Sequence, residues 1–150
     1  GRRKTVKVTV INIPEQDEEE LILKCHTLDE DTANFLERVA ARKKEVTAFK
    51  GEEIHRIELK DIYYFEVVDN KSFFYLADEV YESRMKLYEF QEICYGTALF
   101  RASKSMIINS DKINYITPSF SGRFEVTFDN EEKVVVSRQY VNELKERMGV

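Results

Sequence analysis

The sequence predicts a mainly β protein with short α-helices, in which one main domain follows a small N-terminal segment. Three observations predict this. Many short stretches alternate apolar and polar side chains with a period of two, and clusters of turn-forming residues separate them. Helical spacing of apolar residues is confined to a few short stretches. A chain of 150 residues, 43% of them hydrophobic, is large enough for one well-buried core.

The N-terminal segment, residues 1–43, is predicted to form a β-hairpin followed by a helix. Residues 5–10 (TVKVTV) and 21–25 each alternate as a half-buried strand does, and an acidic turn joins them. Thr27 and Glu30 have the spacing of a capping box ahead of an amphipathic helix. A hairpin and one helix are too small to bury their own apolar faces, so this segment must dock on the main domain or on a second copy of itself.

The main domain, residues 44–150, is predicted to be an antiparallel β structure. Strands are expected over residues 46–49, 54–59, 62–69, 73–76, 79–83, 113–117, 123–128 and 133–137. A helix is expected from about Met85 to Cys94, and a last helix is expected to open at Ser137, a good N-cap residue. In the apolar triplet 106–108, Met106 and Ile108 should share one face and Ile107 should lie on the other.

Motifs of catalysis and cofactor binding are absent from the sequence. There is no phosphate-cradling glycine loop, no HExxH and no GxSxG, and only two histidines occur. Cys25 and Cys94 lack the partners that would complete a zinc site, so simple burial of both thiols is favoured. We therefore expect no enzyme activity, no cofactor and no metal. No apolar run is long enough to span a bilayer, so no membrane insertion and a cytoplasmic location are expected.

The charge distribution sets the last third of the chain apart. The net charge is −5, and residues 51–95 contain five cationic and eleven acidic side chains, whereas residues 96–150 contain eight and seven. Three cations, Lys71, Lys104 and Arg138, fall on predicted connections, where recognition residues usually lie. An exposed lysine more often serves solubility, so the position of these cations on turns is an indication of binding rather than proof.

The aromatic residues between 63 and 75 admit two interpretations. They could stack on single-stranded bases, but the surrounding region is acidic and would repel phosphate. Packing in the core is the better interpretation.

Two stretches of the C-terminal half, FRASKSMIINSDKINYI and GRFEVTFDNEEKVVVSRQYVNELKERMG, resemble the LytTR (LytR/AlgR-type) DNA-binding domain. The family pattern has a Phe-Arg start, a polar loop, a Ser, an apolar triplet with Asn, and a Ser-Arg-x-Tyr-Val helix opening. The resemblance covers about residues 44–149. The chain departs from the pattern at DNEE, where Asn-Gly is frequent, and at Ala102-Ser103, where a His is frequent.

The resemblance implies about ten antiparallel strands that lay loops into successive major grooves of double-stranded DNA. It implies a transcription regulator that binds repeated promoter sites as a homodimer. By position, the expected DNA-binding residues are Asn70, Lys71, Ser72, Arg101, Ser103, Lys104, Ser105, Ser137 and Arg138.

The resemblance also bears on regulation. Many relatives are response regulators, but some 43 residues are too few for a receiver domain. The chain is therefore similar to stand-alone regulators, whose partner is often a small membrane protein, and the N-terminal segment is the expected dimerisation or regulatory surface. The alternative is a protein-interaction module that uses the acidic residues 51–95, with DNA binding weak or absent.

Overall fold

The computed structural model describes residues 6–40 and 44–150, and the chain divides into two compact units, residues 1–42 and 43–150. In the first unit, helix α1 (Glu30–Ala40) confirms the predicted helix. The side chain of Asp29 accepts a hydrogen bond from the amide of Thr32 at 2.7 Å, so Asp29 caps this helix instead of Thr27.

The predicted N-terminal hairpin is not found. Residues 6–29 form no strand, and the alternating side chains of Val6, Val8 and Val10 are exposed. A two-stranded hairpin is marginal in water unless its apolar face packs on something else, and none of the described residues of this unit covers that face.

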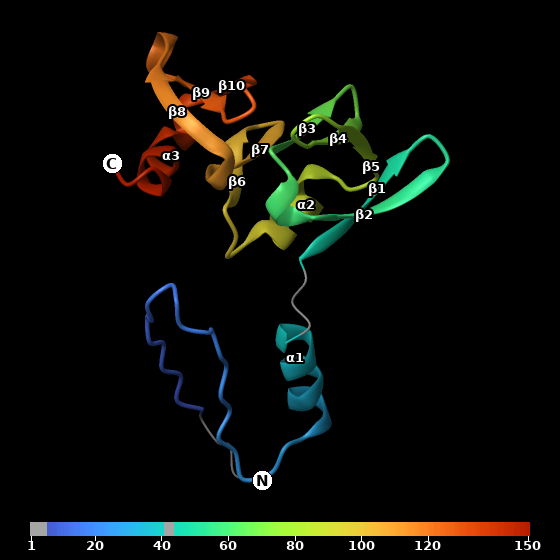
Figure 1. Cartoon of the computed structure of the whole chain (residues 1–150), viewed down its shortest axis with the longest axis vertical. Helices are drawn as coiled ribbons and strands as arrows, with labels where there is room; N and C mark the ends of the chain where they lie inside the picture. The colour runs from blue at the N-terminus through green and yellow to red at the C-terminus, as the bar shows by residue number, and fades with distance from the viewer. Residues whose placement is uncertain (1–5, 41–43) are drawn as a thin grey trace. The chain divides into compact units, whose positions relative to one another are not determined.

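The second unit contains ten strands in two antiparallel sheets, which confirms the mainly β fold (Figure 1). The seven-stranded sheet has the order β2-β1-β5-β4-β3-β7-β6, and the three-stranded sheet has the order β10-β9-β8. The strands of the first sheet are β1 (Glu45–Lys50), β2 (Glu53–Glu58), β3 (Tyr64–Val68), β4 (Lys71–Tyr75), β5 (Val80–Ser83), β6 (Leu99–Ser103) and β7 (Met106–Asn109). Those of the second are β8 (Ile113–Pro118), β9 (Phe124–Phe128) and β10 (Lys133–Val136).

Short helices connect these strands. Helix α2 (Leu87–Cys94) lies between β5 and β6 in the chain, close to its predicted range. The last helix begins with one 3-10 turn, Arg138–Tyr140, and continues as α3 (Val141–Arg147). Another 3-10 turn, Phe120–Gly122, joins β8 to β9.

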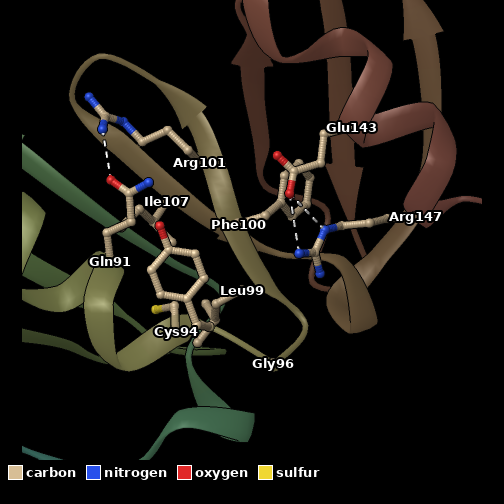
Figure 2. Close-up of a pocket in the computed structure, with 10 residues that line it drawn as sticks. Gln91, Cys94, Gly96, Leu99, Phe100, Arg101, Ile107, Glu143 and Arg147 are labelled. Carbon is tan, nitrogen blue, oxygen red and sulfur yellow. Dashed lines mark hydrogen bonds and ion pairs between the residues drawn. The ribbon is translucent and has the colours of Figure 1, made fainter.

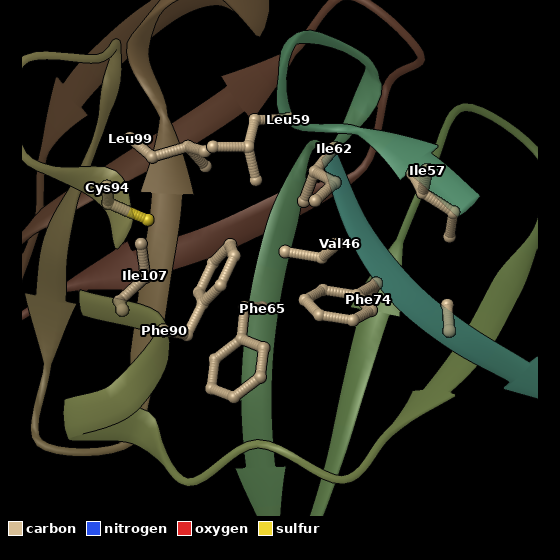
Figure 3. Close-up of a cluster of buried hydrophobic side chains, with 11 residues drawn as sticks. Val46, Ile57, Leu59, Ile62, Phe65, Phe74, Phe90, Cys94, Leu99 and Ile107 are labelled. Carbon is tan, nitrogen blue, oxygen red and sulfur yellow. The ribbon is translucent and has the colours of Figure 1, made fainter. Parts of the chain in front are cut away.

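Two apolar cores flank strand β7. Ile107 is fully buried in the first core with the rings of Phe65, Phe74 and Phe90, which Figure 3 shows together. Met106 and Ile108 are buried in the second core, which contains buried side chains of β9, β10 and α3. The predicted division of the triplet between two faces is confirmed.

The aromatic run of β3 and β4 packs in these cores, as predicted. Tyr63, Phe65 and Phe74 are buried, and the half-buried rings of Tyr64 and Tyr75 stack with their centroids 4.2 Å apart. These faces are used within the protein and are not free to stack on bases.

The two cysteines should differ strongly in reactivity. Cys94 is buried, and this burial raises the pKa of its thiol to about 12, whereas Cys25 is exposed, contrary to the expected burial of both thiols. Because the thiolate is the reactive form, iodoacetamide at neutral pH should label Cys25 alone in the folded protein. Mass spectrometry should detect labelling of Cys94 only after denaturant is added. Rapid labelling of Cys94 in the native protein would contradict its burial.

Candidate nucleic-acid interface

The first predicted contact lies on the turn between β3 and β4. Val68 pairs with Lys71, and the two residues between them, Asp69 and Asn70, have φ values of 50° and 63°. Two successive residues with positive φ make the tight hairpin turn that suits the twist of antiparallel strands, and Asp and Asn tolerate that conformation. Lys71 is exposed immediately after this turn.

Ser72 has a structural position. Its side chain is buried, and its hydroxyl donates a hydrogen bond to the carbonyl of Met85 at 2.6 Å. The hydroxyl therefore ties β4 to the segment before α2 and is not presented to a ligand.

The second predicted contact lies on the turn between β6 and β7. Ser103 pairs with Met106, so Lys104 and Ser105 form the turn, and Lys104 is exposed. The amide of Ser105 donates to the hydroxyl of Ser103 at 3.2 Å. The two serines thus shape the turn, and Lys104 is the side chain that it presents.

The side chain of Arg101 braces this turn by hydrogen bonding to its backbone. Its Nε donates to the carbonyl of Ser103, and one terminal nitrogen donates to the carbonyl of Lys104 at 2.9 Å. The other terminal nitrogen donates to the side-chain oxygen of Gln91 at 3.0 Å, which links the turn to α2 (Figure 2). Since the guanidinium is partly buried and holds three acceptors, we assign Arg101 a positioning role.

The third predicted contact lies where β10 leads into the last helix. Both the amide and the hydroxyl of Ser137 donate to the carbonyl of Ala102, at 2.9 and 3.2 Å. Ser137 is the N-cap residue of the last helix, as predicted, but its side chain makes no capping hydrogen bond to the helix and instead donates to the Ala102 carbonyl of β6.

Arg138 is exposed beside Ser137, and its aliphatic stem passes over Gly122. Gly122 has φ +75°, and a Cβ added there would lie 2.9 Å from the Cδ of Arg138. The backbone conformation therefore favours glycine, and a side chain there would have to displace the stem of the arginine.

These three places lie at one end of the domain. The amide of Val67, one residue before the end of β3, donates to the carbonyl of Ser105 at 2.9 Å, which places the first two turns next to each other. Ser137 is bonded to Ala102, which directly precedes the second turn. The structure thus brings the segments of Lys71, Lys104 and Arg138 together around the β6–β7 turn. In the part of the chain that the structure describes, none of these three cations has an ion pair.

An open polar pocket adjoins Arg138, and it contains residues that were not predicted from the sequence. Its lining residues are Ser121, Arg123, Ser137, Arg138, Gln139 and Asn142. It includes two arginines and no acidic side chain, so it favours an anion. Arg123 lies in the quoted GRF motif and within residues 101–123, which contain four cationic side chains and one acidic one, and this was the signal available in the sequence.

Over residues 6–40 and 44–150, no group of three or more His, Cys, Asp or Glu residues is arranged to hold a metal ion. Within the same ranges, no helix is long and apolar enough to cross a bilayer.

Two antiparallel sheets with exposed cations on adjacent turns define a mainly β-sheet protein with a cationic surface at one end of the domain. The profile of the LytTr DNA-binding domain matches residues 52–149, and the chain belongs to that family. This is a family of DNA-binding domains and not of enzymes.

Known proteins similar to this chain include regulators. The chain is 31% identical over 109 residues to the sensory transduction protein LytT of Enterococcus faecalis, a match that covers 72% of this chain and 45% of that protein. It is 31% identical over 104 residues to the transcriptional regulatory protein YpdB of Escherichia coli K12, covering 69% and 43% respectively. The chain thus spans less than half the length of these relatives.

A solved LytTr DNA-binding domain from Bacillus cereus has the same fold. The TM-score is 0.65 at 24% sequence identity, and the match covers 71% of this chain and 97% of that one.

Proposed function

We propose that this protein is a transcription regulator that binds double-stranded DNA sequence-specifically, by inserting turns into successive major grooves of repeated promoter sites. The observation that carries the proposal is the meeting of three exposed cations, Lys71, Lys104 and Arg138, at one end of the domain. Arginine can bind guanine through two hydrogen bonds in the major groove, and lysine can do so more loosely. Asn70, Ser103 and Ser105 flank these cations and are within the proposed contact surface.

The pocket beside Arg138 supports the same function. Its second arginine, Arg123, is exposed and has no acidic neighbour among the pocket residues, so it suits a DNA phosphate. Phosphate contacts fix the register of a protein on the duplex, while base contacts read the sequence. We therefore assign Arg123 to the backbone and Arg138 to a base.

The N-terminal segment is proposed to provide the dimerisation or regulatory surface. It exposes Val6, Val8 and Val10 together with Leu21 and Phe35, which a second copy or a small membrane-protein regulator could cover. A homodimer would match repeated half-sites on DNA, and the protein would act in the cytoplasm.

The decisive experiment is binding to a labelled duplex from the region upstream of the protein's own gene, over a salt series. Scrambled duplex of equal length serves as competitor. Specific binding that survives this competitor and weakens steeply as salt rises would support the proposal. The contrary result is that the protein prefers neither the upstream duplex nor any duplex selected from a random library over scrambled DNA. The protein would then be an interaction module instead. In that case charge reversal at Glu66, Asp69 and Asp78, in the acidic segment, should abolish partner binding.

Replacing Arg101 with lysine should weaken specific binding by about 1–3 kcal/mol, although the charge is kept. Lysine cannot reproduce the planar set of donors that holds Ser103, Lys104 and Gln91. Hydrogen exchange of the Ser105 amide, which is bonded to Ser103, should speed up as the turn loosens.

The matched control is Lys104→Gln, which should weaken binding without changing that exchange rate. Unchanged exchange in Arg101→Lys would show that Arg101 does not brace the turn.

A further inference from the structure

The ring of Phe120 stands almost entirely in solvent beside the proposed contact residues. Its exposed fraction is 89%, the largest among the large apolar side chains of the described residues. Single exposed apolar side chains are common, so exposure alone assigns no role. Two further features, the rigid turn that carries the ring and the basic pocket next to that turn, do indicate one.

The turn that presents Phe120 is firmly built. The amide of Ser119 donates to the carbonyl of Arg123 at 2.8 Å, and the amide of Arg123 donates to the carbonyl of Phe120 at 3.2 Å. Ser121 and Gly122 follow with φ values of 59° and 75°. These bonds close a tight loop around the β8–β9 connection, so the backbone that carries the ring is fixed and the ring projects from it into solvent.

The same turn is fixed relative to Arg138. Gly122 lies against the arginine stem, since a Cβ added to it would lie only 2.9 Å from the Cδ of Arg138. Ser121 and Arg123, on either side of Gly122, line the basic pocket with Arg138. A duplex that Arg138 contacts would therefore also lie near the β8–β9 turn, which carries Phe120.

We propose that Phe120 packs against the C5-methyl group of a thymine in the major groove, next to the base that Arg138 reads. The thymine methyl is the apolar group that base pairs present in that groove, and aromatic and small apolar side chains contact it. Insertion between base steps is instead a feature of minor-groove binders, and it does not suit a ring carried on a turn next to a major-groove arginine. This inference rests on the proposed function.

The experiment combines a protein variant with a DNA variant. A duplex selected by the wild-type protein from a random library is remade with each thymine in turn replaced by deoxyuridine, which removes only the C5-methyl. For wild type, one replacement per half-site should lower affinity about fourfold, the loss expected for one buried methyl. Phe120→Ala should bind the unmodified duplex about five- to fiftyfold more weakly and should lose the response to that replacement.

Matched controls separate this contact from general effects. Tyr88→Ala removes an aromatic ring that is 64% exposed on α2, and it should keep both wild-type affinity and the response to deoxyuridine. The melting temperature of Phe120→Ala should equal that of wild type, because the ring contributes little to the core.

The outcomes distinguish the two proposals. If the wild-type protein selects no sequence at all, the proposed function fails. If it selects a site but Phe120→Ala binds that site normally, or responds to every deoxyuridine as wild type does, the methyl contact is overturned while the function stands. If Phe120→Ala binds weakly and reduces DNA bending without losing any methyl response, the ring acts as a wedge and the proposal is wrong.

Discussion

Replacement of Lys71, Lys104 and Arg138 together by glutamine should abolish sequence-specific binding to duplex DNA while leaving the domain folded. Each base or phosphate contact of this kind is worth about 1–3 kcal/mol, so affinity should fall by more than roughly a hundredfold. The fold should persist because all three side chains are exposed and none forms an ion pair within the described part of the chain. The dependence of affinity on salt should also flatten, by about 0.9 in logarithmic slope for each phosphate that the variant no longer neutralises.

The matched control changes the net charge equally by glutamine at Arg56, Lys60 and Lys86, which are exposed and belong to neither the proposed interface nor the N-terminal segment. Affinity for the selected duplex should then fall far less than in the first variant. An equal decrease in the two variants would mean that binding depends on overall charge, and the assignment of the three turns would be wrong.

Replacement of Phe90 by alanine should lower the free energy of unfolding by about 3–5 kcal/mol. The ring is fully buried, with its centroid 4.7 Å from that of Phe65 and 5.2 Å from that of Phe74. Its removal leaves a cavity between α2 and the seven-stranded sheet (Figure 3). Since a domain of this size has a total stability of about 5–15 kcal/mol, the variant should be close to unfolding at physiological temperature.

Denaturant titration followed by circular dichroism would measure this change. Phe120→Ala is the ideal control, because it is the same substitution at a ring that is 89% exposed, and it should change stability by less than about 0.5 kcal/mol. A decrease below about 1 kcal/mol in Phe90→Ala would show that the first core can collapse around the missing ring. Because α2 also carries Gln91, the acceptor for Arg101, the Phe90 variant should weaken DNA binding as well.

The parts of the fold that follow a local period could be predicted from the sequence. The division of Met106, Ile107 and Ile108 between two faces follows from the strand period alone, and both cores confirm it. The placement of Lys71 and Lys104 on turns could also be predicted from the sequence, because turn-forming residues flank both of them.

The roles of Arg101, Ser72 and Ser137 could not be predicted in this way. Each side chain donates at least one hydrogen bond to a backbone carbonyl, and which carbonyl lies within reach is decided by how the strands pair. A cation or hydroxyl in a motif therefore gives no indication of whether it will face a ligand or hold the turn that faces it. The same limit explains why Arg123, Gln139 and Asn142 were not predicted, since the 3-10 turns bring them together.

The prediction of an N-terminal hairpin was wrong for a related reason: it also depends on packing that the local pattern does not reveal. Alternation of Val6, Val8 and Val10 describes a strand that is half buried, but burial requires a second surface, and residues 6–29 find none among the described residues of their own unit. The alternation indicates that the segment needs an apolar surface to pack on, but it does not indicate that its own unit provides one.

Strand β7 belongs to both apolar cores, with Ile107 in one and Ile108 in the other, and both side chains fully buried. Neither core can open without pulling this strand out of the other core as well. The two sheets of the second unit therefore cannot separate from each other without disrupting both cores. It should melt in one step, and a strain imposed at the β6–β7 turn by bound DNA would be shared across the whole domain.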